Sequence, residues 1–231
     1  MKLLKIKSAL IAAALMSLIA APAQANIIIS EVDANGSAAS SGYAADWFEL
    51  TNTGTSSVNI TGWKMDDNSN AFANAVGLRG LSSIAAGQSV VFIEGTATGT
   101  TDATINAAFK SAWFGTNVPS NLVIANYGGS GVGLSSTSDA VNIFNSTGSL
   151  ITRVDFGAST LGQTFDNAAG LNNVTITQLS TIGVNSAFKS FNAAEIGSPG
   201  AVAAVPEPAT YAFLIAGMAL LGFMVRRRNT L

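Results

Sequence analysis

Short runs of β-branched and other apolar residues recur along most of this 231-residue chain, and clusters of turn residues separate them. Such runs favour strands over helices, and Gly, Asn, Ser and Thr between them mark turns. The pattern predicts about seven or eight short strands, which is typical of an all-β sandwich. We expect strands at residues 27–32, 47–50, 58–60, 62–65, 89–93, 122–124, 140–144 and 150–154, with residues 145–149 as a hairpin loop.

One segment departs from this pattern. Asp102–Phe114 places its large apolar side chains at helical spacing. The side chain of Thr101 or Asp102 is suited to cap the first turn, and Pro119 prevents the helix from continuing. We expect a short helical insert that covers one end of the sandwich, with Trp113 in a packing role. A ligand platform built on Trp113 is the alternative.

The charged and reactive residues limit the possible functions. The chain has no Cys and no His, so it forms no disulfide and no Ser-His-Asp triad. We therefore expect that it is not an enzyme. Between Asn26 and Val205, twelve acidic residues stand against five basic ones, a net charge of −7. Because nucleic acids are bound by clustered Lys and Arg, no nucleic-acid partner is expected.

The first 25 residues have the three parts of a secretory signal peptide. These parts are a lysine-rich start, an apolar stretch over residues 9–20, and the A-x-A cleavage site of Ala23 and Ala25. Cleavage after Ala25 would leave residues 26–204 as the exported body. A retained N-terminal membrane helix is the alternative, although the apolar stretch is short for one.

The other end of the chain has the features of a membrane stop. Residues 209–225 carry no charge, and this length is at the lower limit for a helix that spans a bilayer. Arg226, Arg227 and Arg228 follow directly and would hold that end in the cytoplasm. The two ends together predict a single transmembrane helix, with the body outside the inner membrane.

A short motif precedes this apolar run. Residues 205–231 begin with Val205-Pro206-Glu207-Pro208, continue into the short apolar helix and end in the basic cluster. This order resembles the PEP-CTERM sorting signal of exported bacterial proteins. The resemblance implies processing by an exosortase, a membrane enzyme whose catalytic Cys lies in another protein, so that Pro206, Glu207 and Pro208 are substrate. It also implies a Gram-negative-type envelope, a final place at the cell surface or outside the cell, and frequent association with polysaccharide or biofilm. A permanent anchor is the alternative.

The body resembles a second family over residues 27–157. The segments that carry the resemblance are IISEV at 28–32, DWFELTNTG at 46–54, VNITGWKMDD at 58–67, IAAGQSVVF at 84–92, SDAVNIF at 138–144, GSLI at 148–151 and VDFG at 154–157. They are similar to the lamin tail domain, an immunoglobulin-like sandwich of nuclear lamins and of many secreted bacterial proteins. GSPG at 197–200 resembles the close of bacterial members. The helical insert and the long segment 160–196 are departures from the family pattern.

Large side chains and two acids stand out within these segments. We expect Trp47, Leu50, Trp63 and Phe92 to be core anchors.

Glu31 and Glu49 lie on expected strands, where carboxylates need donors or water. They are expected to accept loop N–H groups or to pair with Lys64 or Arg153. A shared cation site or an acid/base pair is the alternative.

A possible calcium loop follows the fourth expected strand. Asp66, Asn68 and Asn70 place oxygen ligands at alternate positions, as at the start of an EF-hand loop. Ala71 and Gly77 depart from that pattern, which requires Gly and Glu there. An ordinary polar turn is therefore the first expectation, with no cofactor, and a weak calcium site is the second.

Two functions are open at this point. The first is a non-enzymatic surface or matrix protein that binds polysaccharide or an envelope protein through its sandwich loops. The alternative is an accessory module or hydrolase that acts on envelope substrates through a carboxylate or cation site.

Overall fold

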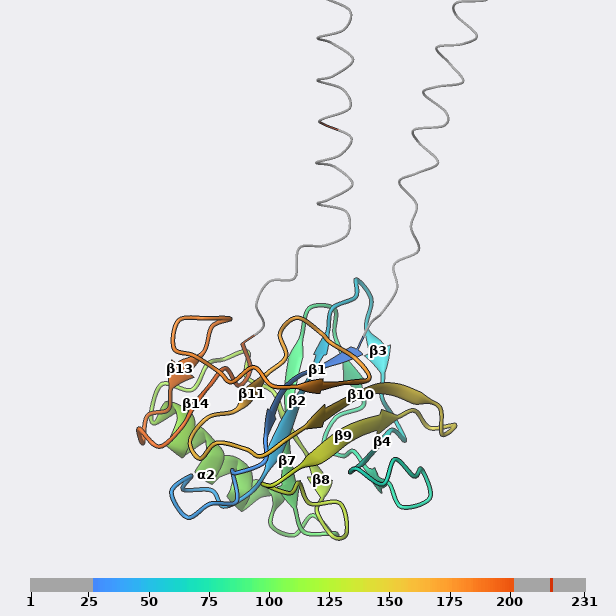
Figure 1. Cartoon of the computed structure of the whole chain (residues 1–231), viewed down its shortest axis with the longest axis horizontal. Helices are drawn as coiled ribbons and strands as arrows, with labels where there is room; N and C mark the ends of the chain where they lie inside the picture. The colour runs from blue at the N-terminus through green and yellow to red at the C-terminus, as the bar shows by residue number, and fades with distance from the viewer. Residues whose placement is uncertain (1–26, 202–216, 218–231) are drawn as a thin grey trace, which may run out of the picture. The chain divides into compact units, whose positions relative to one another are not determined.

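A computed structural model describes residues 27–201 and Gly217. Two five-stranded sheets form the body (Figure 1), with the strand orders β11-β1-β2-β7-β8 and β12-β10-β9-β4-β5. The first sheet consists of β1 (Ile27–Asp33), β2 (Trp47–Asn52), β7 (Ser89–Gly95), β8 (Ile124–Gly128) and β11 (Phe165–Asp166). The second consists of β4 (Lys64–Asp66), β5 (Val76–Gly77), β9 (Asp139–Phe144), β10 (Leu150–Phe156) and β12 (Val174–Ile176).

Smaller elements complete the body. Two strand pairs lie outside the main sheets, and the helix α2 covers Asp102–Phe114. The pairs are β3 (Val58–Asn59) with β6 (Ser83–Ile84), and β13 (Phe188–Lys189) with β14 (Ile196–Gly197). The described residues 27–201 belong to one compact unit.

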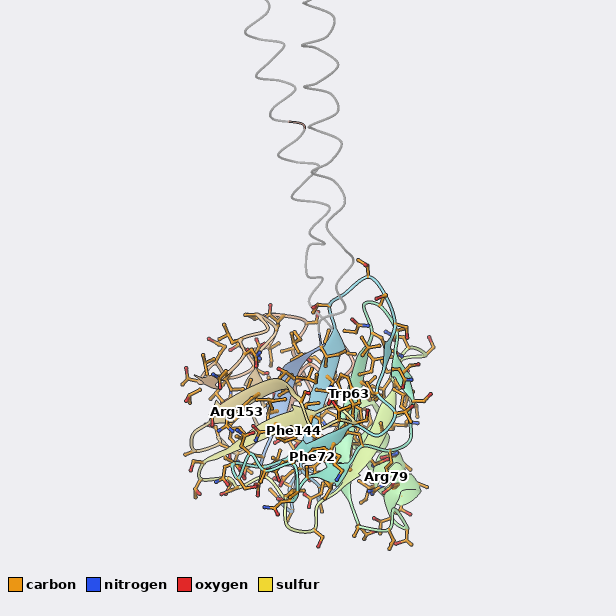
Figure 2. The ribbon with its side chains drawn as sticks, turned by 90° about the vertical axis from the view of Figure 1, so that its right-hand side faces the viewer. Trp63, Phe72, Arg79, Phe144 and Arg153 are labelled. Atoms are coloured by element: carbon orange, nitrogen blue, oxygen red, sulfur yellow. The ribbon has the colours of Figure 1, made fainter. Side chains whose placement is uncertain are left out.

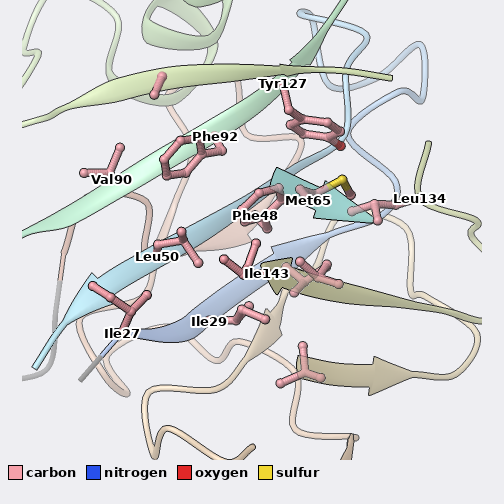
Figure 3. Close-up of a cluster of buried hydrophobic side chains, with 14 of the residues drawn as sticks. Ile27, Ile29, Phe48, Leu50, Met65, Val90, Phe92, Tyr127, Leu134 and Ile143 are labelled. Carbon is pink, nitrogen blue, oxygen red and sulfur yellow. The ribbon is translucent and has the colours of Figure 1, made fainter. Parts of the chain in front are cut away.

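The main core lies between the two sheets, as Figure 3 shows. Phe48 and Leu50 of β2 point into it, whereas Trp47 and Glu49 belong to the opposite face of that strand. The rings of Phe48 and Phe92 stack at 5.4 Å between centroids. Alternation of this kind is what a half-buried strand requires, because successive side chains point to opposite faces. The sandwich predicted from the sequence is confirmed.

A register shift between Ile29 and Glu31 interrupts the pairing of β1 with β2. The shift lets both Ile29 and Val32 enter the core, although three positions separate them. It also leaves Glu31 opposite Glu49 in the register. A bulge of this type re-aims side chains at functional places in a sheet.

Most expected strands are confirmed. Two expected strands differ from the observed ones. In place of residues 122–124, β8 begins only at Ile124 and continues to Gly128, and in place of residues 62–65, β4 begins only at Lys64. Leu122 lies in a turn, where its N–H donates to the Pro119 carbonyl over 3.1 Å. The strands β5 and β6 and those from β11 onwards were not expected, because each is only two or three residues long.

The helix has the bounds that the sequence predicts, but its position differs. It packs on the outer face of the first sheet through a second apolar cluster, which contains Trp47, Ile93, Phe109 and Trp113. The expectation that it covers one end of the sandwich is therefore wrong. The ligand platform on Trp113 is also wrong, because this side chain is 1% exposed.

The expected helix cap is wrong as well. The Thr101 side chain makes no capping hydrogen bond. The Asp102 carboxylate instead accepts two hydrogen bonds from Arg79, over 2.7 and 2.8 Å. This bidentate ion pair fixes the start of α2 to the segment that follows β5.

Replacing Asp102 by Asn is expected to lower the free energy of unfolding by about 1 kcal/mol, because the pair is only partly exposed and bidentate. Urea unfolding of the full chain would measure it. Lys110→Gln is the matched control, since Lys110 is exposed on the same helix. Equal midpoints for D102N and the unchanged protein would contradict the structural role of the pair.

Neither end segment can be assessed in the part of the chain that the structure describes. Within it, no helix is both long enough and apolar enough to cross a membrane. The expected signal peptide lies outside the described residues, and so does the expected transmembrane helix apart from Gly217.

Candidate functional site

The outer face of the first sheet carries two buried carboxyl groups. Glu31 of β1 and Glu49 of β2 are directly opposite each other, and each residue is 1% exposed. Two acids in such positions are costly unless donors compensate them. The donors come mostly from residues 195–201, which we call the closing segment.

The closing segment donates to both acids. Ser198 donates from its backbone N to Glu31 Oε1 over 2.8 Å and from its hydroxyl to Oε2 over 3.1 Å. Gly200 N donates to Glu49 Oε2 over 2.6 Å, and Ser30 Oγ donates to Oε1 over 2.7 Å. The expectation that loop N–H groups satisfy these acids is confirmed.

The expected pairing with Lys64 or Arg153 is wrong. Both cations lie on the second sheet, where Arg153 is labelled in Figure 2. Arg153 pairs with Asp155 and donates to Asn142 Oδ1 over 2.8 Å. Lys64 Nζ lies 4.7 Å from the centre of the Phe72 ring. The two acids therefore depend on neutral donors.

Burial changes the acidity of this pair. Burial, with a further contribution from the charge of Glu49, raises the pKa of Glu31 to about 8. Burial raises the pKa of Glu49 to about 7. Near neutral pH the pair therefore holds at least one proton. Both groups lie beneath the closing segment, so they are not placed to act on a substrate.

A third buried acid holds the start of the closing segment. Tyr43 Oη donates to Glu195 Oε1 over 2.8 Å and accepts the indole N–H of Trp47 over 3.0 Å. Burial, together with the charge of Asp33, raises the pKa of Glu195 to about 9. The outer face thus holds the closing segment at both of its ends.

Sequence reasoning missed Tyr43 and Glu195. A usable signal was present in residues 90–93, Val-Val-Phe-Ile. Such a continuous apolar run indicates a strand that is buried on both faces. It therefore implies that something covers the outer side of the first sheet.

The calcium candidates form a hydrogen-bonded turn. Asp66 Oδ2 accepts Ser69 Oγ and Ala71 N, each over 2.7 Å, and Asn68 N donates to Asp139 Oδ1 over 2.9 Å. Asn70 has a positive φ of 49°. Within residues 27–201, no three His, Cys, Asp or Glu side chains are grouped to hold a metal ion. Calcium binding at Asp66, Asn68 and Asn70 stays a prediction.

A cleft of about 660 Å³ lies beside the closing segment. Its walls come from the turn after β6, the end of α2, the loop before β8, β13 and residues 199–201. The larger side chains that line it include those of Gln88, Phe114, Pro119, Asn121, Phe188 and Pro199. None of the lining residues is charged.

The residues predicted to direct export lie outside the described part of the chain. They are Ala23 and Ala25 at the cleavage site, Pro206, Glu207 and Pro208 in the sorting motif, and Arg226, Arg227 and Arg228 at the membrane stop. The structure places none of them.

Comparison with known proteins gives two family matches. A model described as Lamin Tail Domain matches residues 20–158, and a model described as PEP-CTERM protein-sorting motif matches residues 204–228. No curated protein matches the chain. The first match ends before the closing segment, and the second begins three residues after Ala201, the last residue of that segment.

Proposed function

Since the chain belongs to the lamin tail domain family and ends in a PEP-CTERM sorting motif, we propose that it is a non-enzymatic surface or extracellular-matrix protein delivered by an exosortase. The observation that carries the proposal is the position of the motif at residues 204–228, directly after the compact body. The sorting signal implies an exported precursor that is anchored in the membrane. Removal of the tail would then release a body that keeps its own core.

The non-enzymatic role is supported by the state of the buried acids. The oxygens of Glu31 and Glu49 accept hydrogen bonds from Ser198, Gly200 and Ser30. A glycoside hydrolase would usually need a pair of carboxyl groups open to substrate on both sides of the scissile bond. Within residues 27–201, Glu31 and Glu49 are each 1% exposed, so this pair does not support the alternative of an accessory module or hydrolase that acts through a carboxylate site.

The partner that we propose is extracellular polysaccharide or an envelope protein. The body is acidic and low in charge density, with 10% charged residues in the whole chain. Such a surface does not favour anionic partners, because like charges repel. The loops and the cleft at the closing segment provide the contact surface.

Replacement of Pro206, Glu207 and Pro208 by Ala is expected to prevent processing, because these residues are the proposed substrate of the exosortase. The measurement is the intact mass and the cell fraction of the protein in its native host, with and without that enzyme. The unchanged protein should start at Asn26 and lose everything beyond about residues 206–208. The triple variant should keep its C-terminus and stay in the inner membrane.

A matched control replaces Asn229 and Thr230 by Ala, since these residues follow the arginine cluster. Its processing should equal that of the unchanged protein. A full C-terminus in both hosts would overturn the proposal and favour a permanently anchored protein.

A further inference from the structure

We propose that the cleft beside the closing segment binds a neutral polysaccharide, with sugar rings against Phe114 and Phe188 and hydroxyl groups against the amides of Gln88 and Asn121. The inference rests on the proposed function, because it names the ligand of the delivered body. The cleft volume of about 660 Å³ lies within the usual range for ligand sites.

The apolar wall consists mainly of two aromatic rings. Phe114 at the end of α2 and Phe188 of β13 are half-buried, with ring centres 5.6 Å apart and planes inclined by 42°. Pro119 and Pro199 add apolar surface. The C–H face of a sugar ring packs well on such surfaces, whereas its hydroxyl groups point sideways towards polar groups. This wall would cover only one face of the bound sugar ring. The polysaccharide can therefore continue into solvent on both sides of that ring.

The polar wall carries neutral groups with both donors and acceptors. Gln88 Oε1 accepts the Ala85 N–H over 2.8 Å, which holds the amide in place. Asn121 is exposed at the rim. A side-chain amide offers an acceptor and two donors, so it can bond two neighbouring hydroxyl groups of one sugar.

Charge distinguishes neutral from acidic polysaccharide. No Lys or Arg lines the cleft. The residues between Asn26 and Val205 carry a net charge of −7, which repels uronic-acid polymers. A neutral hexose polymer carries no charge, so it is not repelled in this way.

A peptide partner is less well matched to these walls. The turn at residues 85–87 is Ala-Ala-Gly and offers none of the Trp, Tyr or Arg anchors that dominate protein interfaces. Binding of a peptide in the cleft, in place of a sugar, is therefore the competing outcome of the test.

The buried acids help to shape the cleft. Gly200 N donates to Glu49 Oε2, and this bond holds Pro199 and Ala201 in the wall. The site is thus formed only when the closing segment is docked. The carboxyl group of Glu49 does not touch the ligand. It acts through this bond, which positions one side of the binding surface.

The test uses the full-length chain in a zwitterionic detergent that has no sugar headgroup. The probes are linear neutral gluco-, galacto- and manno-oligosaccharides, with alginate oligosaccharides as the anionic comparison. Titration calorimetry should show saturable binding of at least one neutral series. Ala86→Trp fills the cleft from an exposed turn position and should weaken binding at least about tenfold. Asn121→Ala should weaken it roughly threefold to tenfold, as for the loss of a hydrogen bond.

Ala73→Trp is the matched control, because Ala73 is exposed in the loop between β4 and β5 and lines no part of the cleft. Its affinity should equal that of the unchanged protein. The inference is overturned if no neutral series binds, if A86W binds as well as the unchanged protein, or if alginate binds equally well. A proline-rich peptide is titrated as well. If this peptide binds, A86W weakens its binding and no glycan binds, the inference is also overturned. The titration does not depend on processing of the protein. If no glycan binds but the intact mass shows correct processing in the host, only the binding inference fails and the sorting proposal stands.

Discussion

A chain that ends at Ala158, where the family match stops, is expected to lose cooperative folding, whereas one that ends at Ala201 keeps it. The shorter chain lacks β11, β12 and the closing segment. It therefore loses Phe165 and Ile176 from the main core, where they are 4% and 2% exposed. It also loses the donors Ser198 and Gly200 and the cover over the outer face of the first sheet.

The magnitudes decide this outcome. Deleting a large core side chain costs about 2–5 kcal/mol, and each buried polar group left without a partner costs about 1–3 kcal/mol. Two core residues and two acids together approach the total stability of an ordinary domain, about 5–15 kcal/mol. The outer face would in addition expose apolar surface.

Two chains that both begin at Asn26 allow a direct comparison. Near-ultraviolet circular dichroism and urea unfolding should show a sharp transition for residues 26–201 and none for residues 26–158. A cooperative transition with the same midpoint in both chains would mean that the closing segment is an accessory to the sandwich. The inferred role of the two buried acids in docking this segment would then be wrong.

Stability is expected to fall as the pH rises from about 5 to about 8. The pKa of Glu31 is raised from 4.5 to about 8, and that of Glu49 from 4.5 to about 7. Between those limits the folded state holds protons that the unfolded state has released, so a rise in pH favours unfolding. Each group contributes a slope of roughly 1.4 kcal/mol per pH unit within its own window. Below the unfolded pKa both states are protonated, and this stabilisation is complete.

Urea unfolding at a series of pH values would measure the slope. Glu31→Gln keeps the shape and the neutral form of the side chain, so its curve should be flatter than that of the unchanged protein above pH 5. Asp155→Asn is the matched control on the second sheet, where the carboxylate pairs with Arg153. A stability that rises between pH 5 and 8, or an unaltered slope in E31Q, would contradict the raised pKa of Glu31.

The main sandwich could be predicted because its strands alternate or run apolar over several residues. Residues 47–50 and 140–144 are of this kind, and both lie within observed strands. The helix was predictable from its spacing, but spacing does not say which surface a helix covers. That depended on Trp47, Val91 and Ile93, which come from two different strands.

The closing segment was less predictable for a physical reason. Its contacts are hydrogen bonds from the backbone of Ser198 and Gly200 to acids about 150 residues or more away in the chain. No local periodicity reports such contacts. The cleft is likewise formed by five separate stretches of the chain, and only their folding brings Phe114 and Phe188 together. The sequence did predict that Glu31 and Glu49 need hydrogen-bond donors.

The docking of the closing segment also has a mechanical consequence. A pull on the tail enters the described body at Ala201 and reaches first the few hydrogen bonds that Ser198 and Gly200 make to Glu31 and Glu49. The ladder between β1 and β2 pairs six residues of each strand and is loaded only afterwards. Under tension from an attached matrix, the closing segment, residues 195–201, would detach before the two sheets separate. Its release would lengthen the connection by roughly 24 Å at about 3.4 Å per residue, so the segment can act as a short extensible link that protects the sheets from sudden load.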